Sequence, residues 1–355
     1  MFGGKTKVEC GLKWFEFGRL TSDKLRTPLS IAYGEIATHN HFVLDRGGKV
    51  FNRTAPVIKL PAGATEDEYL ALLGLLNSST ACFWGRQTFF PKGGFAAGKW
   101  EERLVWNGTG LLQFPVTENK PLQITKVLDL LAQSLHQLLP SSLAGKAVPN
   151  KSDWATAHEE AHQILRKMIA LQEELDWECY GHYGLIADPP LAGEAIPEIK
   201  LGERAFEIVL ARQMVVGEVQ TTWFDRHGST PMTEIPAHWS AEYQRIVAER
   251  IRLIETDSNI NLIERPEYKR RWNTEPWEAQ AEGALREWML NRLETPEYWP
   301  TVELQSVAKL ADRARSDADF MQVAELYRGR PDFDVTRLVA ELVESEAVPF
   351  LPGFR

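Results

Sequence analysis

The stretch from Lys49 to Arg86, KVFNRTAPVIKLPAGATEDEYLALLGLLNSSTACFWGR, constrains the fold more than any other part of the chain. Its first half, Val50 to Leu60, is rich in β-branched and apolar residues and ends at a Pro-Ala-Gly turn, which predicts a strand. Its second half predicts a helix capped by Thr65, because three acidic residues follow at the positive end of the helix dipole. Apolar residues then recur at helical spacing as far as Leu76. We therefore expect an α+β unit at the N-terminal end.

The segment before this stretch predicts a β-hairpin. Residues 39–44 and 45–51 are separated by Gly47-Gly48, a typical hairpin turn. Around it lie polar, aromatic and basic residues of the types that contact base edges and phosphates. With cations further along the chain, the candidate DNA-binding residues are His39, Asn40, His41, Arg46, Lys49, Arg53, Lys59, Arg86, Lys92 and Lys99. A solvated hairpin without a ligand is the alternative interpretation.

Charge is unevenly distributed along the chain. The formal net charge is -9, which by itself does not indicate nucleic-acid binding. Basic residues nevertheless outnumber acidic ones between Lys5 and Lys99, and the acidity lies in the C-terminal two-thirds. A DNA-facing surface is therefore expected in the N-terminal third.

Composition also indicates the compartment. The three cysteines lie far apart, which favours a reducing, cytoplasmic location over a disulfide framework. The chain has neither the apolar core of a signal peptide at its start nor the roughly 18 uninterrupted apolar residues of a membrane helix.

Beyond the N-terminal unit the sequence predicts helices. Two long ones are expected at about 121–139 and 152–180, separated by Pro140, and their short connection suggests an antiparallel pair. A Pro-rich segment from Ala187 to Ile199 indicates a domain boundary. Shorter helices are expected at about 204–216, 239–256, 275–294, 302–327 and 334–346.

Three motifs resemble catalytic signatures. His158-Glu159-Glu160-Ala161-His162 fits the zinc-hydrolase pattern H-E-x-x-H, but a polar helix rich in Glu, Gln and His also produces it by chance. Residues 93–99 fit the first seven positions of a P-loop, yet Trp100 stands where a hydroxyl should bind magnesium. Asp188-Pro189-Pro190-Leu191 resembles the tetrapeptide of amino-methyltransferases, with leucine in place of the aromatic residue that stacks on the base. We expect none of the three to be catalytic.

The stretch from Lys49 to Arg86 also carries a resemblance to a known family. A basic strand, a Pro-Gly turn, an acidic-start helix and the ending LLNSS resemble the target-recognition domains of type I and type IIG restriction-modification enzymes. The run MIALQEELDWECYGHYGL, Met168 to Leu185, makes the chain similar to the C-terminal part of the BREX phage-defence adenine-specific DNA methyltransferases, the PglX family. The similarity extends over nearly all 355 residues.

This resemblance implies an organisation and a function. The fold class is α+β: a target-recognition-like DNA-binding domain at 1–117, a long helical spacer pair at 118–186 and a mainly α-helical domain at 187–355. The chain would recognise double-stranded DNA and serve as a scaffold for a methyltransferase catalytic domain, and possible further partners are other BREX proteins. No F-x-G-x-G turn is present, so S-adenosylmethionine is expected in a catalytic domain upstream and no cofactor in this chain. The first alternative is an acidic helical protein-interaction scaffold within a defence complex. The second alternative is a zinc hydrolase that acts through His158, Glu159 and His162.

Overall fold

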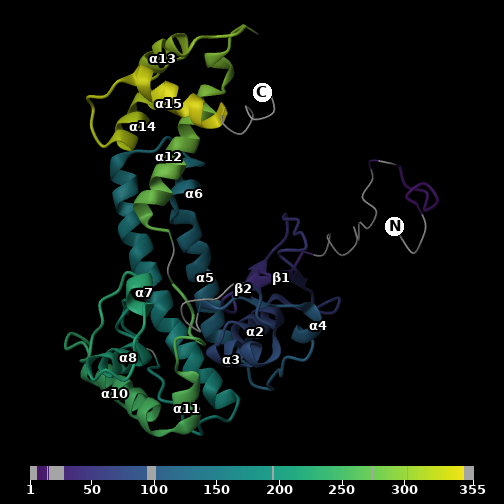
Figure 1. Cartoon of the computed structure of the whole chain (residues 1–355), viewed down its shortest axis with the longest axis vertical. Helices are drawn as coiled ribbons and strands as arrows, with labels where there is room; N and C mark the ends of the chain where they lie inside the picture. Colours follow the sequence, from purple (N-terminus) through teal and green to yellow (C-terminus); the bar gives the residue numbers. More distant parts are fainter. Residues whose placement is uncertain are drawn as a thin grey trace. The chain divides into compact units, whose positions relative to one another are not determined.

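A computed structural model describes residues 6–13, 15, 28–93, 101–193, 196–272, 275–301 and 303–347 (Figure 1). The chain forms two compact units. Unit 1 comprises Met1–Thr125, Glu174–Leu191 and Glu249–Arg271, and unit 2 comprises Lys126–Glu173, Ala192–Ala248 and Trp272–Arg355. Helices dominate and the sheet is small and antiparallel, so the expected α+β class is confirmed. The proposed division into three domains stays a prediction.

Unit 1 contains a three-stranded antiparallel sheet in the order β3-β1-β4. Its strands are β1 (Ser30–Tyr33), β3 (Phe42–Asp45) and β4 (Val57–Ile58). Ala32 in the central strand pairs with Val43 on one side and Val57 on the other. A two-stranded ribbon, β2 (Ile36–Ala37) with β5 (Leu104–Val105), lies in the same unit.

The expected hairpin is wrong in its strand pairing. Strand β3 pairs with β1, which precedes it, and residues 49–51 form no strand. Strand β1 offers β3 a complete apolar face, because Ile31 and Tyr33 are buried on the same side as Phe42 and Leu44. Gly47 and Gly48, with φ of 102° and 79°, reverse the chain after β3 and lead it toward β4. Of the expected strand at 50–60, only β4 forms.

Two helices follow, and the sequence predicts the first of them. Helix α2 (Glu66–Leu76) begins at Thr65 with a complete capping box, in which Thr65 and Glu68 satisfy each other's backbone N–H groups. Helix α3 (Ser79–Thr88) begins at Ser78, whose side chain accepts from the Ala81 N–H. Gly85 lets α3 approach the buried indole of Trp106, since a Cβ there would lie 2.4 Å from the ring.

Distant parts of the sequence meet in unit 1 through a buried ionic cluster. Lys269 Nζ lies 3.0 Å from Asp176 Oδ2 and 2.8 Å from Glu264 Oε1. Asp176 also accepts from Ser79 at the start of α3, from the backbone N–H at 2.8 Å and from the hydroxyl at 2.6 Å. Tyr180 donates its hydroxyl to Glu264. Each buried charge therefore has an opposite charge beside it, and the cluster ties residues 176–180 and 264–269 to α3.

The remaining helices of unit 1 are α4 (Gly108–Leu111) and α11 (Ser258–Ile263). Three more helices begin in the residue range of one unit and end in that of the other: α5 (Leu122–Leu138), α7 (Lys151–His182) and α10 (Ala241–Thr256). The bounds of α5 and α7 confirm the two long helices expected from the sequence. Their antiparallel pairing stays a prediction.

The regular secondary structure that the described residues of unit 2 form is helical, and irregular segments connect the helices. Its own helices are α6 (Pro140–Ala144), α8 (Ala205–Val215), α9 (Trp223–Arg226), α12 (Trp277–Leu293), η2 (Pro296–Tyr298), α13 (Val307–Ser316), α14 (Ala318–Arg328) and α15 (Val335–Ala347). The single helix expected at 302–327 is wrong: Asp317 ends α13, and its carboxylate caps α14. Buried residues of α12 to α15, among them Met289, Phe320 and Leu338, form one apolar core.

Within the described ranges, none of the helices combines the length and the apolar character that crossing a membrane requires.

Candidate nucleic-acid interface

The outer face of the unit 1 sheet carries a hollow of about 610 Å³. The strand pairing places Ala32 and Val43 side by side on the face opposite the buried Ile31 and Phe42. Val43 is 53% exposed, and Ile36, which also lines the hollow, is 45% exposed. With Phe51 they form an apolar surface that no described residue covers.

Cations surround this apolar surface. Lys49 and Arg103 line the hollow and are exposed, and neither forms an ion pair with any described residue. Arg53, two residues beyond Phe51, is 92% exposed, and its Nε lies 3.8 Å from the Glu35 carboxylate, a long and solvated pair. These three side chains present positive charge to solvent, as contact with phosphates requires.

One carboxylate, that of Asp45, also lines the hollow. Its Oδ2 accepts from the backbone N–H of Gly47 at 3.3 Å, which stabilises the turn after β3. No described residue donates to its second oxygen. The hollow therefore combines cationic donors at Lys49 and Arg103 with one carboxylate.

Both histidines among the predicted DNA-binding residues, His39 and His41, lie in the wall of the hollow. Burial, followed by the charges of Arg271 and Arg270, lowers the pKa of His39 well below its usual value. Loss of hydration and then the charge of Arg270 lower the pKa of His41 to about 4, although part of His41 remains exposed. Both rings are therefore neutral at pH 7. His39 Nδ1 lies 3.1 Å from the Thr38 hydroxyl, and its buried Nε2 has no partner among the described residues.

Two other predicted cations, Arg46 and Lys59, are placed less favourably for a ligand. Arg46 is paired with Glu66 at 2.6 Å, and Lys59 is half-buried. Lys92 is exposed next to the strand-like bridge at Pro91. Lys99 lies outside the described residues.

Asn40 and Arg86 hold the fold together. The buried Asn40 amide donates to the backbone oxygens of Leu76 and Ser78, at the junction of α2 and α3. Arg86 donates to the Glu267 and Thr38 backbone oxygens at 3.0 and 2.9 Å, and its side chain is only 8% exposed. We therefore leave these two residues out of the proposed contact surface.

Two cations in or near the hollow were not predicted from the sequence. Arg103 belongs to the Gly- and aromatic-rich segment 87–106, next to β5, and pairing of β5 with β2 places it at the hollow. Arg270 comes from far along the chain, and its Nη2 lies 3.3 Å from His41 Nε2. The signal that could have found it is the run Lys269-Arg270-Arg271 within an acidic region.

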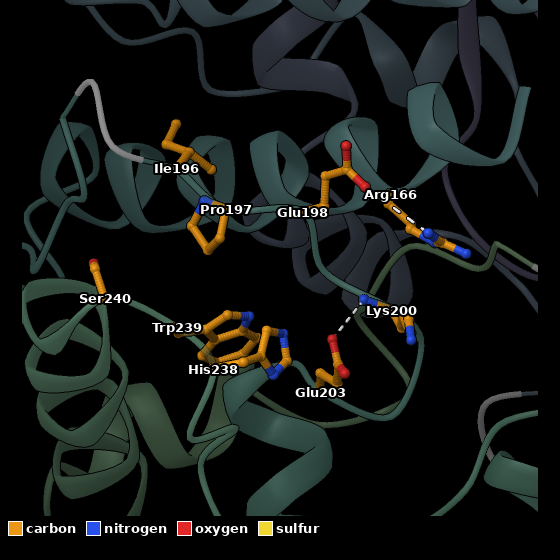
Figure 2. Close-up of a pocket in the computed structure, with 9 residues that line it drawn as sticks. All are labelled: Arg166, Ile196, Pro197, Glu198, Lys200, Glu203, His238, Trp239 and Ser240. Atoms are coloured by element: carbon orange, nitrogen blue, oxygen red, sulfur yellow. Dashed lines mark hydrogen bonds and ion pairs between the residues drawn. The ribbon is translucent and has the colours of Figure 1, made fainter. Parts of the chain in front are cut away.

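A second pocket, of about 440 Å³, lies in unit 2 (Figure 2). The segment 196–200 forms one side, and His238, Trp239 and Ser240, which precede α10, form the other. It is lined by two cations and two carboxylates: Arg166 lies 3.9 Å from Glu198, and Glu203, which accepts from the Lys200 backbone N–H at 2.8 Å, is three residues from Lys200. Two carboxylates beside two cations do not favour a polyanion.

The catalytic signatures gain no support. His158 and His162 lie one turn apart on α7 with ring centroids 4.4 Å apart, but His158 stacks on Trp277. The described residues contain no group of three or more His, Cys, Asp or Glu side chains suited to a metal. All of the P-loop-like segment except Gly93 lies outside the described residues. Asp188–Leu191 follows α7 as irregular chain without a preceding strand.

Comparison with known proteins agrees with the resemblance seen in the sequence. A family model described as "Domain of unknown function (DUF7008)" matches residues 168–355. The adenine-specific methyltransferase PglX of Streptomyces coelicolor (strain ATCC BAA-471 / A3(2) / M145) is 45% identical over 374 aligned positions. The alignment covers 100% of this chain and the C-terminal 31% of the relative, so the chain spans about a third of that protein's length. The expected similarity to the C-terminal part of PglX is therefore confirmed. No solved structure matches.

Proposed function

The chain belongs to the family of the domain of unknown function DUF7008, and from that premise we propose that it recognises and holds DNA for adenine-specific methylation. In this proposal unit 1 contacts the duplex, and a methyltransferase catalytic domain acts on the adenine. The similarity to PglX supports the link to an adenine-specific methyltransferase. A place in a BREX-type phage-defence system, with further defence proteins as partners, is part of the same proposal.

The observation that carries the proposal is the group of exposed cations around the hollow of unit 1. Lys49 and Arg53 come from one segment and Arg103 from another, and the three lie on or beside one face of the sheet. Phosphate contacts position a protein on a duplex, and base-edge contacts then read the sequence. The cations are suited to the first task. His41, with its neutral imidazole, and Asp45 are suited to the second.

In this proposal methyl transfer and duplex positioning belong to different domains, because of the motifs that the sequence lacks. The sequence lacks the Gly-rich turn and the complete tetrapeptide that would bind S-adenosylmethionine and the target base. Methyl transfer is therefore assigned to a catalytic domain, where S-adenosylmethionine would bind. Unit 1 would fix the position of the duplex relative to that domain.

The test is duplex binding by fluorescence anisotropy across a range of salt concentrations. We expect affinity to fall steeply as salt rises, because bound phosphates release counterions. The triple variant Lys49→Ala/Arg53→Ala/Arg103→Ala should bind more weakly, and its salt slope should be smaller by about 1 for each phosphate that the variant can no longer neutralise. The matched control removes three exposed cations of unit 2, in Lys151→Ala/Lys309→Ala/Arg330→Ala.

Equal effects of the two triple variants would mean that binding follows overall charge, and the proposed surface would be rejected. Absence of salt-dependent binding by the chain, both alone and with a catalytic domain supplied, would instead favour the protein-interaction scaffold.

A further inference from the structure

We propose that the hollow of unit 1 receives a nucleobase that has left the base stack. This inference rests on the proposed function and adds to it: the sheet surface would hold one unpaired base while its cations hold the flanking phosphates. The occupant would be a single nucleotide of the bound duplex, with its base against Val43 and Phe51.

The walls of the hollow fit the face of a base. Ile36, Val43 and Phe51 offer apolar and aromatic surface, and the two aliphatic side chains are about half exposed. A volume of about 610 Å³ exceeds what a single base needs and leaves room for its sugar. Every base has an apolar π-face, so this kind of surface accepts a base without selecting its identity.

The polar groups of the hollow fit the edge and the backbone of the same nucleotide. Lys49 and Arg103 are the lining cations, and they are placed to contact the phosphates on either side of the base. Asp45 has an acceptor oxygen to which no described residue donates, which suits the exocyclic amine of adenine or cytosine.

Asp45 also argues against a simpler occupant. A phosphate seated within the hollow would lie beside this carboxylate and against apolar walls, where its charge is poorly stabilised. A base presents neutral surface to the walls and an amine to the carboxylate. The charge pattern therefore places phosphates at the rim and the base inside.

The test compares two duplexes that differ by one base. The first carries a single bulged adenosine. The second carries a bulged abasic site at the same position, which distorts the duplex similarly but offers no base. We expect the protein to bind the adenosine bulge about tenfold more tightly than the abasic bulge, because only the adenosine offers a base that can stack in the hollow.

Val43→Trp fills the hollow and should abolish this preference, so that the two bulged duplexes bind with equal affinity. Val50→Trp is the matched control, since Val50 is 79% exposed and does not line the hollow. Salt-dependent binding of every duplex with equal affinity would overturn this inference and leave the proposed function standing. If the unmodified protein bound no duplex in a salt-dependent way, both this inference and the proposed function would be overturned.

Discussion

Unit 1 and unit 2 differ in how their charged side chains are arranged. Unit 1 separates them into a buried, paired cluster around Lys269 and a group of exposed cations around the hollow. In unit 2 the Arg166 guanidinium at the Figure 2 pocket lies 3.9 Å from the Glu198 carboxylate, and the buried Arg204 and Glu207 form a pair at 2.7 Å. Burial alone would raise the pKa of Glu207, but the charge of Arg204 and hydrogen bonds from Arg204, Trp223 and Gly202 lower it.

The comparison shows why net charge is a poor guide to partners in this chain. A polyanion needs cations that are exposed and not neutralised by close carboxylates, and the net charge of -9 says nothing about their location. The described surface of unit 1 provides such cations beside apolar surface. The pocket of unit 2 has cations as well, but its own carboxylates offset them.

The largest expected effect comes from breaking the buried cluster of unit 1. Lys269→Ala leaves Asp176 and Glu264 buried without their cation, so the free energy of unfolding should fall by about 3–5 kcal/mol. Urea unfolding measures this change, with the exposed Lys309→Ala as control, for which we expect less than about 0.5 kcal/mol. Duplex affinity should fall too, because Arg270 follows Lys269 in the chain and contacts His41, which lines the hollow. Equal stability of the two variants would contradict the buried cluster.

A smaller effect is expected from the histidines of the hollow. In the unfolded chain they bind protons near the usual pKa of about 6.5, whereas in the folded protein the pKa values of His39 and His41 are lowered. Protons then favour the unfolded state, so the stabilising contribution is complete above about pH 6.5 and declines as pH falls toward about 4, the pKa of His41. We expect the urea midpoint to drop between pH 7.5 and pH 5. His39→Gln/His41→Gln should drop less, and an identical drop would refute the lowered pKa values.

The smallest effect concerns helix caps in the two units. Thr65→Ala removes the cap of α2 in unit 1, and Ser306→Ala removes the cap of α13 in unit 2. Each should lower the free energy of unfolding by about 1 kcal/mol. Neither side chain lies at the proposed surface, so duplex affinity should stay the same in both variants. A selective loss of DNA binding in Thr65→Ala would place the contact surface nearer to α2 than we propose.

Local signals predicted the helices well. The Thr65 cap, the apolar spacing of α2 and the long periodic segments of α5 and α7 are properties of neighbouring residues, and each helix formed where expected. The failure at 302–327 was also local. Asp317 caps α14, and the cap was hidden inside a continuous helical pattern.

Strand pairing and the makeup of the site were not predictable in this way. Strand β3 had a plausible partner after the Gly-Gly turn, and only the three-dimensional packing shows that β1 satisfies it instead. Arg270 lies beside His41 because the neighbouring Lys269 is held by the carboxylate of Asp176, 93 residues earlier in the chain. Asn40 and Arg86 have the side chains of DNA-contacting residues, but their hydrogen bonds to backbone oxygens within the fold emerge only in the structure.

The most direct test of DNA recognition by unit 1 is to locate the DNA on the protein. Duplexes carrying 5-iododeoxyuridine, crosslinked by light to the chain and analysed by mass spectrometry, report which peptides touch the bases. We predict crosslinks within residues 36–55, which include His41 and Phe51 beside the hollow. Crosslinks confined to residues 196–240, around the pocket of unit 2, would contradict the assignment of DNA recognition to unit 1.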